Sequence, residues 1–344
     1  MDNACACAQG GRKKNGFVKT RGIRSKKANK LPVVGLDSIG TTTDKSECVN
    51  TTKDGHCVSE TMIVAIAEFI KTVPDDKSGQ GEDSTRDATS DATRDATSDA
   101  NLIVSKAAGA LSCDSESCVI THPSFRKFGN RSGLATASQI NGELETRFKF
   151  VGPREGNSLL SNIHIDETLQ RWARVFTSFY CCPFAMMDFE VNGDKLEKID
   201  IYEVFEGKVP LDIGHKEVVL RPANTFACVL NTDISSGPGK HWVAIFVDNR
   251  NPICSIEYFN SAGNPPTKAV TRWMAKAKKR LVSKGGAAEI VAVTDIDHQE
   301  SQTECGVYTL YYVRRRLEGT PYTFFFDRLV PDDLMTEFRK HCFR

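Results

Sequence analysis

Hydrophobic residues recur every three or four positions in several stretches of this chain, which is the spacing of amphipathic helices. In residues 59–73, Ser59 can cap such a helix and Pro74 can end it. Gly285 can end another helix in the same way. The pattern predicts helices over residues 59–73, 102–111, 166–180 and 267–284.

Unbroken apolar runs dominate the second half of the chain and are typical of buried strands. A turn-forming segment, Asn249–Pro252, separates two of these runs and predicts a hairpin. A further helix is expected to begin at or beside Cys305. Strands and helices therefore follow one another in an order that indicates the α+β class, with strands over residues 226–231, 242–248, 253–259 and 289–294.

Two stretches of the first hundred residues show no such pattern. Residues 1–50 are rich in Lys, Gly, Ser, Thr and Asn and are expected to be largely disordered. Asp83–Ala100 repeats Asp-Ala-Thr-Arg or Asp-Ala-Thr-Ser with no large apolar side chain, so it cannot bury a core. We interpret this repeat as a flexible spacer.

Composition narrows the class of protein. The chain has 344 residues, of which 40% are hydrophobic and 26% charged, as in soluble globular proteins of about two domains. No apolar run approaches the ~18 residues of a membrane-spanning helix. The chain has 12 cysteines, too few for a disulfide scaffold, and shows no export signal. We therefore expect reduced thiols and a cytosolic setting.

Positive charge is concentrated at the start of the chain. Residues 1–30 contain nine Lys or Arg and one acid, whereas the whole chain has a net charge of +1. Such a segment can contact nucleic acid or another polyanion, here through residues 12–30. It can equally be a solvated tail, and the sequence leaves both readings open.

Metal and nucleotide sites find little support. Cys113, Cys118 and His122 are residue types that bind zinc, but the usual pairs of ligands are incomplete, so ordinary thiols are favoured. Gly237–Lys240 does not have the spacing of a phosphate-binding loop. We expect no metal and no other cofactor.

Four polar residues of the second half suit nucleophilic catalysis. A thiolate at Cys305 would be stabilised by the N-terminus of the expected helix. His241 precedes one strand and could act as its base, while Asn260 ends the next strand and could orient the imidazole. The Gln299 amide could donate to an oxyanion, and Gly306 would let a substrate backbone approach.

The spacing HW(x)17N followed by Q(x)5CG resembles the adenovirus-protease and SUMO-protease superfamily of papain-like cysteine peptidases. Longer strings resemble the polyprotein-processing cysteine proteases of African swine fever virus and its giant-virus relatives. These strings follow one another in order from about Cys113 to Arg344: CDSESCVITHP, ELETRF, NIHIDETLQRWA, CPFAMMDFE, RPANTFACVLNTD, GKHWVAIFVD, SIEYFNSAGN and HQESQTECG.

The resemblance implies a papain-like core with a central mixed sheet flanked by helices, preceded by a helical arm domain. We place the basic arm at residues 1–50, the arm domain at 51–156 and the catalytic core at 157–344. Cys305, His241 and Asn260 match the family's nucleophile, base and orienting residue, and Gln299 matches its oxyanion-hole glutamine.

The same resemblance implies a function and a setting. Members of this family cleave viral polyprotein precursors after Gly-Gly during virion maturation, which places them in the host cytoplasm and the virion. A narrow channel roofed by Trp242 would explain the Gly-Gly preference, although Trp242 can also be strand core. An isopeptidase acting on Gly-Gly tails of ubiquitin-like modifiers is one alternative, and a catalytically inactive nucleic-acid-binding virion protein is another.

Overall fold

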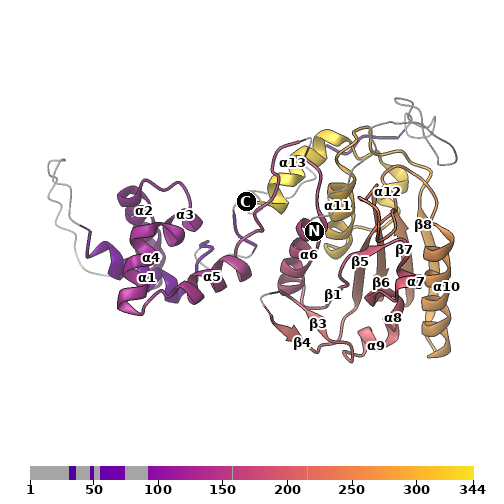
Figure 1. Cartoon of the computed structure of the whole chain (residues 1–344), viewed down its shortest axis with the longest axis horizontal. Coiled ribbons are helices and arrows are strands. Elements are labelled where there is room, and N and C mark those ends of the chain that lie inside the picture. Colours follow the sequence, from indigo (N-terminus) through magenta and orange to yellow (C-terminus); the bar gives the residue numbers. More distant parts are fainter. Residues whose placement is uncertain (1–30, 36–46, 50–54, 74–91, 157, 215) are drawn as a thin grey trace. The chain divides into compact units, whose positions relative to one another are not determined.

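The structure is a computed structural model that describes residues 31–35, 47–49, 55–73, 92–156, 158–214 and 216–344 (Figure 1). The contacts divide the chain into a helical unit, Glu47–Lys149, and a sheet unit, Phe150–Arg344 with the preceding segment Leu31–Gly35. The second unit begins before the boundary expected at 156/157, because Phe150 forms a parallel bridge with Phe343.

A six-stranded mixed sheet forms the centre of the sheet unit. The strand order is β1-β5-β6-β7-β8, and β2 also pairs with β5. β5, β6 and β7 are antiparallel neighbours, whereas β1 and β8 join the sheet in parallel. The strands are β1 (Phe179–Cys181), β2 (Ala185–Met186), β5 (Thr225–Asn231), β6 (Trp242–Asp248), β7 (Ile253–Phe259) and β8 (Ala287–Val293), with a separate ribbon of β3 (Leu211–Asp212) and β4 (Val218–Val219).

Helices cover this sheet, as Figure 1 shows for α10 beside β8. Helix α10 packs on β7 and β8, while α11 packs on β5 and β6 and is buried along most of its length. This confirms the expected α+β class and mixed sheet. The helices of this unit are α6 (Asn162–Val175), α7 (Phe189–Asn192), α8 (Lys195–Lys198), α9 (Ile201–Phe205), α10 (Lys268–Ser283), α11 (Cys305–Leu317), α12 (Phe324–Asp327) and α13 (Asp332–Cys342).

One buried arginine ties helix α11 to two strands at once. The Arg316 guanidinium lies 2.8 Å from the Asp248 carboxylate of β6 and 2.6 Å from the Glu257 carboxylate of β7. Tyr312, one turn earlier on α11, donates its hydroxyl hydrogen to the same Glu257 at 2.6 Å. Because these charges are buried, removing one partner would leave another uncompensated, so the pairing specifies where α11 sits.

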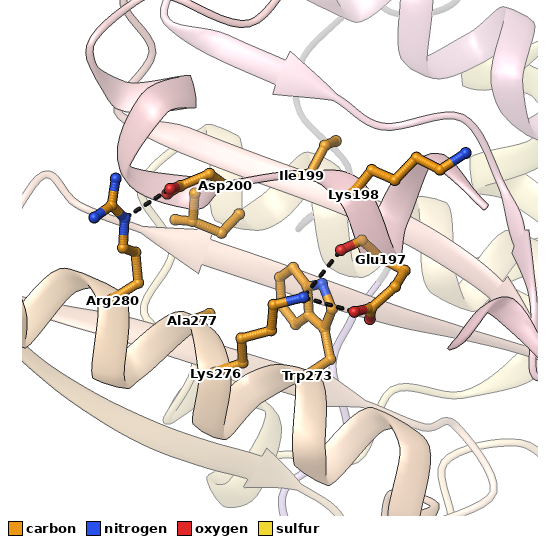
Figure 2. A pocket seen from close by; sticks show the side chains of 9 residues that line it. Glu197, Lys198, Ile199, Asp200, Trp273, Lys276, Ala277 and Arg280 are labelled. Atoms are coloured by element: carbon orange, nitrogen blue, oxygen red, sulfur yellow. Dashed lines mark hydrogen bonds and ion pairs between the residues drawn. The ribbon is translucent and has the colours of Figure 1, made fainter. Parts of the chain in front are cut away.

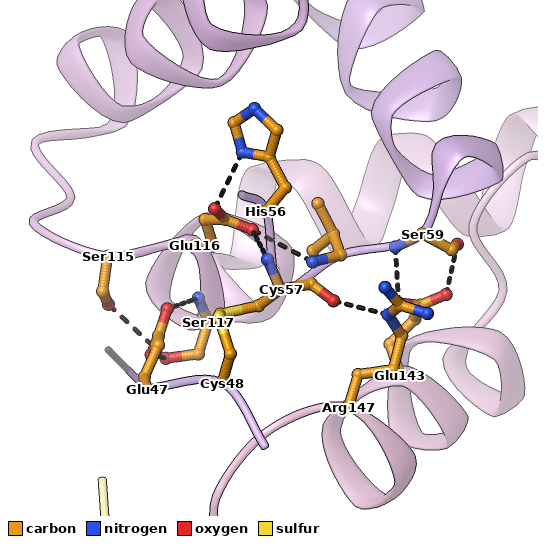
Figure 3. Close-up of a disulfide and its surroundings, with 11 residues drawn as sticks. Glu47, Cys48, His56, Cys57, Ser59, Ser115, Glu116, Ser117, Glu143 and Arg147 are labelled. Atoms are coloured by element: carbon orange, nitrogen blue, oxygen red, sulfur yellow. Dashed lines mark hydrogen bonds and ion pairs between the residues drawn. A yellow bond between two sulfur atoms is a disulfide. The ribbon is translucent and has the colours of Figure 1, made fainter. Parts of the chain in front are cut away.

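The helical unit contains α1 (Glu60–Ile70), α2 (Ala92–Leu111), α3 (Glu116–Thr121), α4 (Pro123–Ser132) and α5 (Ala137–Thr146) around its own apolar core. Partly buried carboxylates hold the loop before α1, as Figure 3 shows. Glu116 accepts hydrogen bonds from the N–H groups of Cys57 and Val58, and Glu143 accepts one from Ser59. Ser59 also caps α1, as the sequence predicts.

Two disulfides in the helical unit correct the expectation of reduced thiols. Cys48 is bonded to Cys57, and Cys113 to Cys118. The second bond also rules out zinc binding by that pair of thiols, since both sulfurs are used. These pairs were not predicted from the cysteine spacing, because they depend on how the chain folds. A β-bridge between Cys48 and Phe148 holds the segment that contains Cys48, which is bonded to Cys57. Six described cysteines of the sheet unit, Cys305 among them, form no disulfide.

Two local predictions differ from the structure. The expected helix 166–180 ends at Val175, where Phe176 leaves helical geometry and β1 soon follows. Helix α2 begins at Ala92, so residues 92–100 of the repeat are helical and not a spacer, while 83–91 lie outside the described residues. Once residues 100–111 form a packed helix, extending it backward through Ala-containing repeats costs little.

A short part of the N-terminal arm is ordered. Val34 is buried in the core of the sheet unit, and Val33 bridges Leu329. This corrects the expectation of disorder for Leu31–Gly35, whose apolar side chains have a surface to cover. Residues 12–30, the candidate polyanion contact, lie outside the described part of the chain. Of the helices described, none combines the length and hydrophobicity needed to cross a membrane.

The Cys48–Cys57 disulfide predicts a measurable contribution to the helical unit. Closing a loop between cysteines nine residues apart should stabilise the folded unit by about 2.5 kcal/mol. We expect hydrogen exchange in α1 of the full chain to accelerate correspondingly when both cysteines are replaced by serine. Reductant should have the same effect on the unsubstituted protein and none at this loop in the variant. Equal α1 protection in variant and unsubstituted protein would contradict the prediction.

Candidate active site

The β6–β7 hairpin brings His241 and Asn260 to one edge of the sheet. His241 directly precedes β6 and Asn260 directly follows β7, and the register of the pair sets Ala244 opposite Phe259. The two side chains meet with His241 Nε2 at 2.8 Å from Asn260 Oδ1. Eighteen residues lie between His241 and Asn260 in the sequence, but the two side chains are adjacent because β6 and β7 are antiparallel neighbours.

Backbone contacts fix the orientation of the Asn260 amide. Its Oδ1 accepts a hydrogen bond from the N–H of Ala262 at 2.9 Å, and only an oxygen can accept there. Its Nδ2 donates to the Tyr258 hydroxyl at 3.2 Å. Asn260 is 3% exposed, so these contacts hold it in place. The atom that faces His241 is therefore the amide oxygen.

This orientation determines the tautomer of His241. Because Asn260 Oδ1 can only accept, His241 Nε2 must carry a hydrogen. In the neutral imidazole the unprotonated nitrogen is then Nδ1, which leaves Nδ1 for the hydrogen bond between His241 and the Cys305 thiol. The ring is arranged to take a proton from that thiol.

Electrostatics around His241 favour its charged form. Burial lowers the pKa of His241, but its hydrogen bond to Cys305, the Cys305 thiolate charge and the hydrogen bond to Asn260 all raise it. The net shift of the His241 pKa is upward from its ordinary value. An imidazolium next to a thiolate is the ion pair used by cysteine nucleophiles.

Cys305 is the first residue of helix α11, as the sequence predicts. The partial positive charge at a helix N-terminus stabilises a thiolate there. The side chain is 1% exposed in this structure. Because Arg316 anchors the same helix to β6 and β7, the strands that carry His241 and Asn260 also fix the position of Cys305.

The loop before His241 is organised around a buried carboxylate. Asp233 accepts hydrogen bonds from the N–H groups of Ile234 and Gly239 and lies 2.7 Å from Lys240 Nζ. Burial raises the pKa of Asp233, but these contacts lower it by more, so the pKa of Asp233 lies below its ordinary value. A Cβ on Gly237 would lie 2.3 Å from this carboxylate, so only glycine fits. The loop thus delivers His241 in one conformation.

Gln299 is held beside the residue that follows Asn260. Its Nε2 donates to the Ser301 carbonyl at 2.8 Å, and its Oε1 accepts from the Ser261 hydroxyl at 2.8 Å. An amide nitrogen has two hydrogens, so the contact with Ser301 leaves the second available in principle for an oxyanion.

Two residues considered for substrate contacts pack against Leu160. Trp242 is 1% exposed and donates its indole N–H to the Leu160 carbonyl at 3.1 Å, which agrees with the strand-core alternative. A Cβ on Gly306 would lie 2.9 Å from the Leu160 side chain. The missing side chain of Gly306 therefore makes room for Leu160 and not for a substrate backbone.

The residues that support these groups were not predicted from the sequence. Tyr258 lies two positions before Asn260, and strand alternation alone would have placed both on one face. Tyr308 of α11 donates its hydroxyl hydrogen to Asp332 of α13 at 2.8 Å, and Asp332 accepts from the N–H of Ser301 at 2.7 Å. This second set fixes the loop that contains Gln299, but no sequence periodicity connects its members.

A cavity lies away from these residues, and the described part of the chain holds no cluster of metal ligands. A cavity of about 170 Å³ between α8, α9 and α10 is rimmed by the Lys276–Glu197 and Arg280–Asp200 ion pairs (Figure 2). None of the four candidate catalytic residues lines it. Across the residues that the structure describes, no group of three or more His, Cys, Asp and Glu could hold a metal ion.

Comparisons with known proteins identify the family of this chain. Residues 199–343 match the family model of the Ulp1 protease family, C-terminal catalytic domain. A cysteine protease of African swine fever virus is 52% identical over 234 residues, 68% of this chain and 84% of the relative. A protein of Acanthamoeba polyphaga mimivirus named as a thiol protease is 26% identical over 230 residues, 67% of this chain and 68% of that protein.

A crystal structure of the African swine fever virus protease superposes with a TM-score of 0.71 and 42% sequence identity, and the match covers 90% of this chain and 98% of that one. The fold and these relatives define a cysteine-type peptidase. This chain belongs to the Ulp1-type cysteine protease family that includes the African swine fever virus enzyme.

Replacing Asn260 tests the orientation of the imidazole. We expect Asn260→Ala to lower kcat/KM of peptide cleavage roughly 10–1000-fold, the scale of a lost orientation. Asn260→Asp should retain more activity, because a carboxylate still accepts from Nε2–H and Ala262 N–H. Tyr258→Phe, which leaves the Asn260 oxygen in place, should lose less than Asn260→Ala. Lower activity for Asn260→Asp than for Asn260→Ala would contradict the role.

The raised pKa of His241 predicts how kcat/KM depends on pH. Because the pKa of His241 is raised, the ion pair should persist above the ordinary histidine value, so the alkaline limb of kcat/KM should lie above ~6.5. The Asn260 hydrogen bond is one cause of that raised pKa, so Asn260→Ala should move the limb to lower pH.

Proposed function

We propose that this protease is a viral cysteine endopeptidase that cleaves polyprotein precursors after Gly-Gly during virion maturation. The Asn260 amide is the observation that supports the catalytic part of this proposal. The Ala262 N–H fixes its oxygen, which accepts from His241 Nε2 and so leaves the unprotonated Nδ1 for Cys305. The 52% identity with the African swine fever virus protease supports the viral setting.

In the proposed reaction His241 Nδ1 takes the proton of the Cys305 thiol, and the thiolate attacks the carbonyl carbon of the second glycine. The Gln299 amide and the Cys305 backbone N–H stabilise the oxyanion. The peptide C–N bond then breaks, and His241 gives its proton to the leaving amine. Water next attacks the thioester carbonyl, which releases the carboxylic acid product and restores the thiol.

The proposed preference for Gly-Gly rests on the family resemblance alone. Trp242 no longer supports it, since its ring is core. We also propose that the protein acts in the viral factories of the host cytoplasm and is packaged into the virion, because polyprotein precursors would be processed there. The basic residues 12–30 remain a proposed contact for nucleic acid or another polyanion.

A second candidate is removal of ubiquitin-like modifiers from Gly-Gly tails. The observation that favours it is the Ulp1 family match, together with African swine fever virus relatives that bear the name SUMO-1 cysteine protease. Measuring kcat/KM on a modifier conjugate and on a Gly-Gly-X peptide separates the two. Faster turnover of the conjugate would favour the isopeptidase.

Cleavage assays on a viral-type Gly-Gly-X peptide test the proposal. We expect Cys305→Ala and His241→Ala to reduce turnover to background, since one removes the nucleophile and the other its base. Cys254→Ala, which changes another buried free thiol, is the matched control and should keep activity. Peptides with Ala in place of either glycine should be cleaved more slowly.

Two reagents complete this test. Alkylation of the protein should stop cleavage, whereas a metal chelator should leave it intact, because the mechanism uses a thiol and no metal. Near-normal turnover by Cys305→Ala would overturn the assignment of the nucleophile. Equal turnover of the Ala-substituted peptides would overturn the Gly-Gly preference alone.

A further inference from the structure

An acidic residue directly precedes the proposed nucleophile. Glu304 occupies the N-cap position of α11, and its carboxylate is 4% exposed. Carboxylates near a helix N-terminus usually accept hydrogen bonds from the first-turn N–H groups. The Glu304 side chain makes no such capping bond. Its charge is therefore engaged elsewhere.

Arg339 of α13 holds this carboxylate. Arg339 Nε donates to Glu304 Oε2 at 2.8 Å, and the arginine side chain is 0% exposed. The Thr303 hydroxyl lies 3.4 Å from the other carboxylate oxygen. The pair is thus desolvated and joins the last helix of the chain to the start of the nucleophile helix.

The same guanidinium also binds the chain segment that packs on the nucleophile helix. Arg339 donates to the backbone carbonyls of Pro153 and Ser158. This segment continues to Leu160, whose side chain fills the space at Gly306 and whose carbonyl accepts from Trp242. One arginine therefore contacts both the residue before Cys305 and the segment that supports Gly306.

The charge of Glu304 has a chemical consequence at Cys305. A carboxylate near a thiol disfavours the thiolate by like-charge repulsion, and a nearby cation offsets that effect. The titratable and charged groups that the structure places around the start of α11 are His241, Glu304 with Arg339, and Asp332, which binds Tyr308 and the N–H of Ser301.

We propose that Arg339 and Glu304 form a positioning pair for the nucleophile: Arg339 holds the Glu304 carboxylate away from the first turn of α11 and neutralises its charge beside Cys305. Neither residue touches the reacting atoms. The pair acts through the Cys305 thiolate and the N–H groups at the helix start. This inference rests on the proposed role of Cys305 as the nucleophile.

The test measures the pH dependence of Cys305 alkylation in the full chain. Iodoacetamide modification is quantified by mass spectrometry of the peptide that contains Cys305, which separates it from the other thiols. The variants are Glu304→Gln, which removes a negative charge, Arg339→Gln, which removes the compensating positive charge, and the double variant with both amides. Arg174→Gln, which breaks the ion pair between α6 and Glu217 outside the site, is the control for loss of a largely buried arginine.

The proposal predicts shifts of opposite sign. Glu304→Gln should move the midpoint of alkylation to lower pH, and Arg339→Gln should move it to higher pH, each by about one pH unit. The double variant should return toward the unsubstituted protein. Arg339→Gln should also lower kcat about tenfold with little change in KM, because it affects the chemical step. Arg174→Gln should leave the alkylation midpoint unchanged.

Unchanged midpoints in both single variants, or shifts in one direction for both, would overturn the proposal, since purely structural damage has no charge-dependent sign. If circular dichroism shows that Arg339→Gln does not fold, Glu304→Gln decides alone: a shift to lower pH supports the pair, and an unchanged midpoint overturns it. Alkylation needs no substrate. A failure to cleave Gly-Gly peptides would therefore refute the proposed function without changing this result.

Discussion

The geometry of the site depends on the two buried ion pairs of the Arg316 guanidinium. The guanidinium bonds α11 to Asp248 on β6 and Glu257 on β7, and those three elements carry Cys305, His241 and Asn260. Removing one partner of a buried ion pair typically costs about 3–5 kcal/mol, so alternative placements of α11 are strongly disfavoured. The hairpin register then decides which residues meet at its edge.

Both ends of the nucleophile helix are tied by buried arginine–carboxylate pairs. Arg316 anchors the part remote from Cys305, and Arg339 binds Glu304 at the start. Between these pairs, the Tyr308 hydroxyl links α11 to Asp332 and so to the loop of Gln299. A helix fixed in this way keeps its N-terminus at a constant position relative to the imidazole, which a pre-formed ion pair requires.

The two units differ in sulfur chemistry. The helical unit contains the two disulfides described, and the cysteines described in the sheet unit form none. A thiol nucleophile needs reducing conditions, which also act on disulfides. Glu116 and Glu143 hold the Cys57–Ser59 backbone through hydrogen bonds that do not depend on redox state, so part of that loop's order survives reduction.

Local pattern predicted much of the fold. The buried runs gave β5, β6 and β7 within a residue, and Thr267 caps α10 where a helix was expected, because short-range periodicity sets these elements. The ion pairs were not predictable: Arg316 and Glu257 are 59 residues apart and Arg339 and Glu304 are 35 apart, and no periodic signal links them.

Burial was equally hidden from the sequence. Trp242 follows the base directly, and a strand pattern cannot say whether an aromatic ring faces a channel or a core. The helix through residues 92–100 was missed for a related reason: its polar composition conceals that packed residues further along can extend it. The sequence placed the candidate catalytic residues at element ends, but their hydrogen-bond directions came only from the structure.

We propose that Cys305 forms the acyl intermediate with a Gly-Gly substrate. A peptide whose C-terminal Gly-Gly bears an electrophilic vinyl ester tests it most directly, by intact-mass measurement and peptide mapping of the adduct. We expect a single adduct on Cys305, formed more slowly in His241→Ala and outcompeted by a Gly-Gly-X peptide. An adduct on another thiol, or none on Cys305 while the protein still cleaves the peptide, would contradict it.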